Sequence, residues 1–155
     1  ADPERCGTYE VIIEPVIEYQ DKNIISLSIN VYMYLGGAHG MYGTESFIID
    51  RKTGENITGK ILGTEKDAVL EKIYNYISEN SQEVFFSGDM IEKKCVTTDC
   101  PIFVKTGKDT VQIRYVIYSV AAYAAGEQVF EYNQKTKKLY FFNQLDGNEQ
   151  KLEVK

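Results

Sequence analysis

The chain has 155 residues, of which 43% are hydrophobic and 26% are charged, and its formal net charge is −6. This length fits one domain whose core needs neither disulfides nor a metal, and no apolar run is long enough for a transmembrane segment. The acidic balance excludes nucleic acid as the expected partner, because phosphate binding needs clustered lysine and arginine, and it favours basic partners.

We interpret residues 1–155 as a single domain in three parts. Residues 8–60 hold N-terminal strands and a glycine-rich loop, residues 61–101 a helix and an irregular segment, and residues 102–155 antiparallel strands.

Two runs of alternating apolar and polar residues open the domain. The runs "YEVIIEPVIEY" (9–19) and "IISLSINVYMY" (24–34) predict long strands, and the short polar connection "QDKN" predicts a hairpin between them. In the second run the apolar set is Ile25, Leu27, Ile29, Val31 and Met33, opposite Ser26, Ser28 and Asn30. We therefore expect the apolar face to be buried and the serine face to be wet.

The stretch "YLGGAHGMYG", residues 34–43, contains the only histidine, His39. A serine-type hydrolase would need His39 as its base together with a nucleophile, but no Gly-x-Ser-x-Gly elbow is present. A metal site at His39 would need carboxylates from other segments. We expect a tight turn with a structural or contact-making His39, no catalytic residues, no metal and no cofactor.

A third strand, "TESFIID" (44–50), is followed by a turn in which Gly54 supplies a positive φ. Thr64 and Asp67 predict a capped helix start, and apolar residues at helical spacing follow from Val69 to Ile77. We expect this helix to pack on the apolar face of the sheet. Residues 80–101 are predicted to be irregular, with a second short helix around residues 84–90.

The three cysteines leave two alternatives open. Cys95 and Cys100 flank "VTTD" and could close a small disulfide ring or remain two free thiols, and Cys6 is left over. We favour the ring, which indicates an oxidising compartment.

The last third is again strand-like. The pairs "IFV" with "TVQIRYVIY" and "QVFEY" with "KLYFF" each surround a turn, and "LDGNEQKLEV" adds a short edge strand. Strands and helix do not alternate, so we predict an α+β fold: an antiparallel β-sheet with one main helix packed on one face.

Tyrosines gather near the glycine loop and near a second stretch, "YSVAAYAAGE" (118–127). The group comprises Tyr32, Tyr34, Tyr42, Tyr115, Tyr118 and Tyr123. Tyrosine is enriched at recognition surfaces, so the group favours binding over catalysis, although any one member could instead belong to the core.

Several motifs in this order resemble a known family. They are an aromatic strand end with "GGAHG" (34–40), then "D-x-x-TG" (50–54), then a helix, and finally Tyr118 with "YAAG" (123–126). Residues 19–143 thereby resemble a bacterial extracytoplasmic domain family of unknown function, found in RsiV-type lysozyme-sensing anti-sigma factors and beside the deacetylase in PdaC-like peptidoglycan deacetylases. The family carries prolines at the positions of Ile117 and Ala122, so we expect a less rigid loop here. Its members have a further N-terminal strand-and-helix portion, and we expect a shortened or divergent version.

The resemblance implies a non-catalytic, extracytoplasmic binding or sensing domain of the cell envelope. It implies a partner such as lysozyme, a basic protein, or alternatively cell-wall glycan bound by an accessory domain of a cell-wall enzyme. An enzyme acting on cell-wall material, using His39 or a carboxylate pair, is the least favoured alternative. The predicted contact residues are Tyr34, Gly36, Gly37, His39, Tyr118 and Tyr123.

Overall fold

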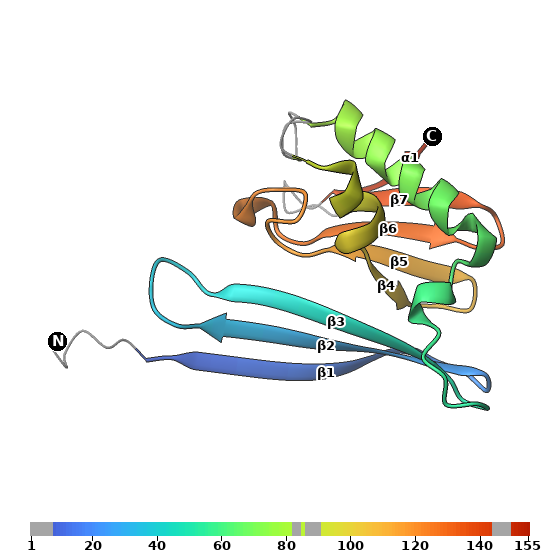
Figure 1. Cartoon of the computed structure of the whole chain (residues 1–155), viewed down its shortest axis with the longest axis horizontal. Helices are drawn as coiled ribbons and strands as arrows, with labels where there is room; N and C mark the ends of the chain where they lie inside the picture. The colour runs from blue at the N-terminus through green and yellow to red at the C-terminus, as the bar shows by residue number, and fades with distance from the viewer. Residues whose placement is uncertain (1–7, 82–84, 86–90, 144–149) are drawn as a thin grey trace, which may run out of the picture.

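The computed structural model describes residues 8–81, 85, 91–143 and 150–155 (Figure 1). Its strands and helix in chain order are β1 (Glu10–Gln20), β2 (Ile24–Tyr34), β3 (Met41–Asp50), α1 (Lys66–Glu79), β4 (Ile102–Lys105), β5 (Thr110–Tyr115), β6 (Gln128–Asn133), β7 (Lys138–Asn143) and β8 (Gln150–Val154). Four short helical turns complete them: η2 (Thr58–Lys60), η3 (Gly63–Glu65), η5 (Cys95–Asp99) and η6 (Tyr123–Ala125).

The strands form two separate sheets rather than the one sheet that was predicted. A three-stranded sheet has the order β1-β2-β3 and a five-stranded sheet the order β4-β5-β6-β7-β8. Neighbouring strands in both sheets pair antiparallel. The predicted α+β class with antiparallel pairing and one main helix is confirmed.

Helix α1 covers the five-stranded sheet (Figure 1). Its apolar stripe of Val69, Leu70, Ile73 and Ile77 is buried, as helical spacing predicted. These side chains share one hydrophobic core with residues of β5, β6 and β7, among them Phe130 and Phe141. The core of the molecule therefore lies between α1 and the second sheet, and not against the apolar face of the first sheet.

The predicted helix cap at Thr64 is wrong. Thr64 lies inside η3, and Glu65 at the N-cap position makes no side-chain cap hydrogen bond. The amide of Glu65 instead donates to the Leu62 carbonyl at 3.1 Å. The chain thus enters α1 through a 3₁₀ turn that is already helical, which leaves no extended N-cap for a threonine side chain to fill.

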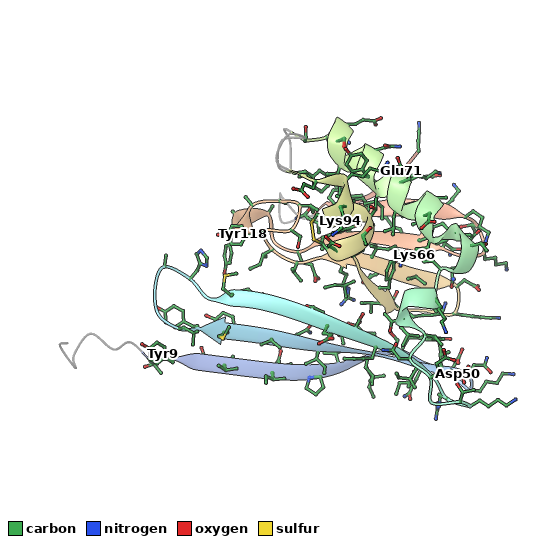
Figure 2. All side chains as sticks on the ribbon, viewed as in Figure 1. Tyr9, Asp50, Lys66, Glu71, Lys94 and Tyr118 are labelled. Atoms are coloured by element: carbon green, nitrogen blue, oxygen red, sulfur yellow. A yellow bond between two sulfur atoms is a disulfide. The ribbon has the colours of Figure 1, made fainter. Side chains whose placement is uncertain are left out.

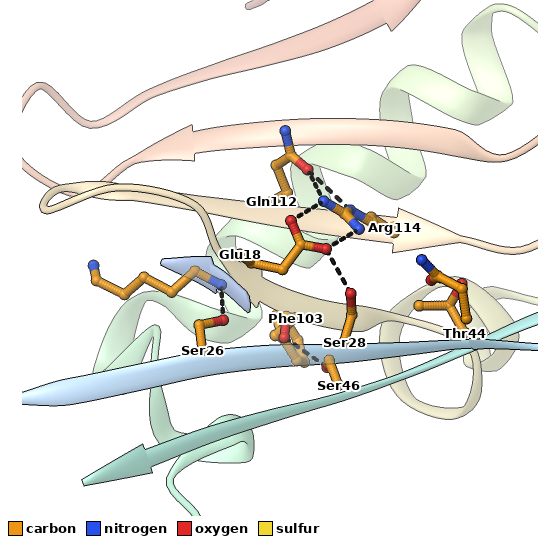
Figure 3. Close-up of polar contacts among 10 residues, drawn as sticks. Glu18, Ser26, Ser28, Thr44, Ser46, Phe103, Gln112 and Arg114 are labelled. Carbon is orange, nitrogen blue, oxygen red and sulfur yellow. Dashed lines mark hydrogen bonds and ion pairs between the residues drawn. The ribbon is translucent and has the colours of Figure 1, made fainter. Parts of the chain in front are cut away.

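The buried face of the first sheet is also the opposite of the one predicted. Ser26 and Ser28 are completely buried, whereas Val11 and Ile13 on the apolar face are 57% and 62% exposed. The reason is the edge of β4, which lies on the serine face (Figure 3). The amide of Lys105 donates to Ser26 Oγ at 3.1 Å. Serine hydroxyls thus satisfy backbone groups that the open edge of β4 would otherwise leave unpaired.

A second polar link joins the sheets beside these serines. Ser46 Oγ donates to the carbonyl of Phe103 at 2.8 Å. Arg114 on β5 donates to both carboxylate oxygens of Glu18 on β1, at 2.8 and 3.2 Å (Figure 3). Glu18 stands at a β-bulge, where the β1–β2 register shifts, and Ser28 Oγ donates to it at 2.6 Å.

The Glu18–Arg114 ion pair is largely buried, since each side chain is only 14% exposed. Burial alone would raise the pKa of Glu18. Hydrogen bonds from Arg114 and Ser28, and the charge of Arg114, outweigh burial and lower this pKa below its ordinary value. The pair therefore joins β1 to β5 at a position where a lone carboxylate would be costly.

Of the remaining predicted elements, some are confirmed, one strand is shorter than predicted, and one helix lies outside the described residues. The hairpin β6–β7 and the late edge strand β8 are confirmed. Strand β5 ends at Tyr115 rather than at Tyr118, because the chain turns there. The predicted short helix at residues 84–90 lies outside the described residues apart from Phe85, which forms an isolated bridge with Ala121.

Candidate functional site

The glycine-rich loop between β2 and β3 takes its shape from three of its glycines. Gly36 and Gly37 have φ values of 90° and 110°, a region that side chains with a Cβ rarely adopt. Gly40 has an ordinary φ, but a Cβ there would lie 2.5 Å from Cζ of the Tyr32 ring. The loop thus needs glycine twice for its backbone and once for close packing against Tyr32.

The predicted contact residue Tyr34 supports this loop from within. Its hydroxyl donates to the carbonyl of Gly37 at 2.9 Å. Tyr34, Gly36 and Gly37 therefore shape the loop, and His39 is one of its exposed side chains, together with Leu35.

The second loop follows β5 and holds Tyr118 in an unusual backbone conformation. The φ of Tyr118 is 65°, which is strained for a bulky residue. The side chain is 48% exposed and points from this loop toward the first sheet (Figure 2). After a short extended segment the chain enters η6, which positions Tyr123.

The two loops meet, although their aromatic residues are about 80 positions apart. The ring centroid of His39 lies 4.0 Å from that of Tyr123 in a stacked arrangement, and 6.3 Å from that of Tyr118. The two tyrosine rings are 5.8 Å apart. We refer to His39, Tyr118 and Tyr123 as the aromatic cluster, and it unites three of the six predicted contact residues.

The hydrogen bonds of His39 indicate what its ring can do. Nδ1 lies 3.0 Å from the carbonyl of Gly40, so Nδ1 carries the proton and donates to this oxygen. Nε2 lies 3.4 Å from the Tyr118 hydroxyl oxygen, and either atom can be the donor of this hydrogen bond. Nδ1 thus ties the ring to its own loop, and Nε2 links the two loops. Among the described residues, neither nitrogen is hydrogen bonded to a serine, cysteine or carboxylate that nucleophilic catalysis would pair with a histidine.

A cleft of about 630 Å³ opens next to the aromatic cluster, between the two sheets. One wall is the serine face of the first sheet, which contributes Tyr32 and Tyr42. The other wall is the end of β5 with the following loop, which contributes Arg114, Tyr123 and Glu127. Tyr123 therefore belongs to both the cluster and the cleft.

Sequence reasoning missed part of this wall and misplaced one tyrosine. Arg114 and Glu127 carry no local signal, because their environment depends on the first sheet, about a hundred residues away in the sequence. Tyr115, grouped with the loop tyrosines, is a core residue with no exposed surface, and its hydroxyl donates to the Val96 carbonyl at 2.8 Å.

A disulfide adds a covalent restraint outside the aromatic cluster. Cys95 and Cys100 are joined by a disulfide across η5, and Cys6 lies outside the described residues. Within the ranges that the structure describes, no three histidine, cysteine or acidic side chains gather in a way that could hold a metal ion. In the same ranges no helix is long and apolar enough to cross a membrane.

Comparisons with known proteins connect this geometry to one fold. Residues 1–42 match a family model described as "Deacetylase PdaC". A DUF3298-family structure from Bacteroides fragilis has a TM-score of 0.60 and 19% identity, and the match covers 85% of this chain and 54% of that one. A DUF3298-family structure from Pseudomonas aeruginosa has a TM-score of 0.55 and 15% identity, with coverages of 78% and 56%. No curated protein sequence matches.

These likenesses define a class of fold. The two-sheet, one-helix architecture is that of the DUF3298 structures, and this chain spans about half the length of the chains that it matches. The residues that match the deacetylase model, 1–42, include the glycine-rich loop between β2 and β3.

Proposed function

We propose that this chain is a non-catalytic, extracytoplasmic binding or sensing domain of the bacterial cell envelope, and that the aromatic cluster contacts a basic protein such as lysozyme. The observation that carries the proposal is the meeting of the two motif-bearing loops. Each loop carries one of the sequence motifs, and together the loops present His39, Tyr118 and Tyr123 at one exposed edge of a cleft.

The physical character of the cluster supports a contact role. Tyrosine offers a large rigid surface with a polar tip, so little conformational entropy is lost when it is covered. The strained backbone of Tyr118 costs on the order of 1–3 kcal/mol, and such strain clusters at binding and active sites, although Lys137 in the β6–β7 turn has a similar φ of 61°.

Charge and redox environment support the partner class and the compartment. A net charge of −6 accelerates encounter with a basic protein. The Cys95–Cys100 disulfide suits an oxidising compartment outside the cytoplasm.

A cell-wall glycan is the second candidate ligand. The tyrosine rings that line the cleft favour it, because sugars stack on aromatic faces and hydrogen bond to hydroxyl and carboxylate groups. A glycan-binding accessory domain would bind a chitin oligosaccharide in the absence of any protein.

Surface mapping by NMR tests the proposal. Unlabelled c-type lysozyme is added to the ¹⁵N-labelled chain, and amide signals are followed. We expect loss or shift of signals at residues 34–43 and 118–126, with the β6–β7 hairpin unaffected. Changes confined to other surfaces, or none at equimolar lysozyme, would contradict the proposed contact.

A further inference from the structure

The cleft beside the aromatic cluster has an unusual balance of charge. The arginine in its lining, Arg114, already has hydrogen-bond partners. Besides the carboxylate of Glu18, it donates to Gln112 Oε1 from Nε at 2.9 Å and from Nη2 at 2.7 Å. The ion pair with Glu18 offsets the charge of Arg114, and the bonds to Gln112 fix the orientation of its guanidinium along β5.

Two carboxylates in the cleft lining lack such compensation. Glu14 on β1 and Glu127 just before β6 stand on opposite walls. Among the described residues neither carboxylate has a hydrogen-bond or ion-pair partner. Burial raises the pKa of Glu127; the charge of Arg114 opposes this shift and the charge of Glu18 adds to it.

Apart from Asn30 and Thr44, where the Thr44 hydroxyl donates to Asn30 Oδ1 at 3.1 Å, the rest of the lining is apolar or aromatic. Ile12 belongs to the first sheet, and Val116 and Ile117 to the loop after β5. The rings of Tyr32 and Tyr42, which also line the cleft, lie 4.8 Å apart. A ligand that fits this lining has a cationic end for the carboxylates and an aliphatic part for the apolar walls.

We propose that the cleft binds a lysine or arginine side chain of a protein partner, with the cationic group at Glu127 and the aliphatic stem along Val116 and Ile117. The inference rests on the proposed function, because it names the chemical group by which the basic partner engages this domain. Long cationic side chains place their stems on apolar surfaces, and their charged ends interact favourably with tyrosine faces and carboxylates.

A neutral sugar fits these observations less well. It would cover Glu127 without supplying a charge, and covering an unpaired carboxylate is costly. A cation removes this cost by pairing with the carboxylate. The glycan is therefore an alternative outcome of the test and not the favoured ligand.

The test uses two small probes that differ mainly in charge, so that it does not depend on any protein partner. Nα-acetyl-arginine amide and its neutral analogue Nα-acetyl-citrulline amide are titrated into the ¹⁵N-labelled chain. We expect the arginine probe to shift the amides of Thr44, Gly126 and Gln128 saturably at millimolar concentrations. The citrulline probe should bind about tenfold more weakly or not at all.

Matched variants assign the charge to one carboxylate. Glu127→Gln should weaken the arginine probe about tenfold, whereas Glu45→Gln, an exposed change on the opposite face of β3, should leave it unchanged. Should Glu127→Gln fail to fold, as its amide spectrum would reveal, Glu14→Gln provides the second measurement and should weaken the probe several-fold.

Three results would overturn the inference: equal binding of both probes, unchanged binding by Glu127→Gln, or cleft shifts caused only by a chitin trisaccharide. The proposed function fails separately. Binding of the arginine probe without binding of lysozyme would keep the cleft assignment and discard that partner. If lysozyme binds and the arginine probe does not, the proposed function stands and the cleft assignment fails.

Discussion

Replacing Gly40 with alanine tests whether the glycine-rich loop depends on close packing, as the structure indicates. Gly40 is buried at the end of the loop. A Cβ built there would lie 2.5 Å from Tyr32 Cζ and 2.6 Å from its hydroxyl oxygen. Real Cβ atoms do not approach other heavy atoms so closely, so either the Tyr32 ring or the loop must move.

The size of the effect follows from what must move. Displacing Tyr32 disturbs its ring contact with Tyr42 at 4.8 Å and one wall of the cleft. Displacing the loop moves the Gly40 carbonyl, which accepts the hydrogen bond from His39 Nδ1. Overpacking of this kind costs about 1–3 kcal/mol, and we expect Gly40→Ala to lower the free energy of unfolding by that amount.

Urea unfolding of Gly40→Ala and of Gly43→Ala gives the comparison. A Cβ at Gly43 on β3 has nothing within 4 Å, so this control should be neutral or slightly stabilising. Equal stability of the two variants, together with unchanged chemical shifts at His39 and Tyr118, would refute the packing role assigned to Gly40.

Three further predictions concern the links that hold the fold. Arg114→Ala should lower the free energy of unfolding by about 3 kcal/mol, because it leaves the largely buried Glu18 without its partner. Lys60→Ala removes the exposed ion pair with Glu55 and should lower the free energy of unfolding by less than about 1 kcal/mol. Urea unfolding of both variants gives the comparison. Burial raises the pKa of Glu18, but the hydrogen bonds from Arg114 and Ser28 outweigh it and lower this pKa in the folded state. As the pH falls, the unfolded chain therefore binds a proton at Glu18 before the folded chain does. The free energy of unfolding should fall as the pH drops below about 5. In Glu18→Gln the urea midpoint should fall less steeply with decreasing pH than in the unmodified chain. An equally steep fall would contradict the contribution assigned to Glu18. Replacing both Cys95 and Cys100 with serine opens a short covalent ring and should cost about 2 kcal/mol in thermal unfolding, while no change in stability would refute a stabilising role for the disulfide.

The period-two alternation of the sequence was enough to predict the strands, but not to predict which face each strand buries. Ser26 and Ser28 look like the wet face of an amphipathic strand, and in the structure they are completely buried. The cause is a long-range contact, since Ser26 receives a hydrogen bond from the backbone of Lys105, 79 residues later. Such contacts leave no mark within a local window of sequence.

The candidate site was predictable only in part, for a similar reason. His39, Tyr118 and Tyr123 were singled out by their motifs, and the fold brings them together. Glu127 had no signal, because an acidic residue beside a strand is ordinary until the opposite wall of the cleft is known. The close packing of Gly40 against the Tyr32 ring could likewise not be predicted, because the glycine-rich stretch indicated only a turn.

A calorimetric titration of this chain with a c-type lysozyme, at low and at physiological salt, tests the central proposal most directly. We predict saturable one-to-one binding that weakens with salt but persists at physiological ionic strength. The double variant Tyr118→Ala/Tyr123→Ala should weaken this binding about tenfold or more, and Tyr140→Ala on β7 should not. Binding heat that disappears at physiological salt, or that is the same for the double variant and the control, would contradict the proposal.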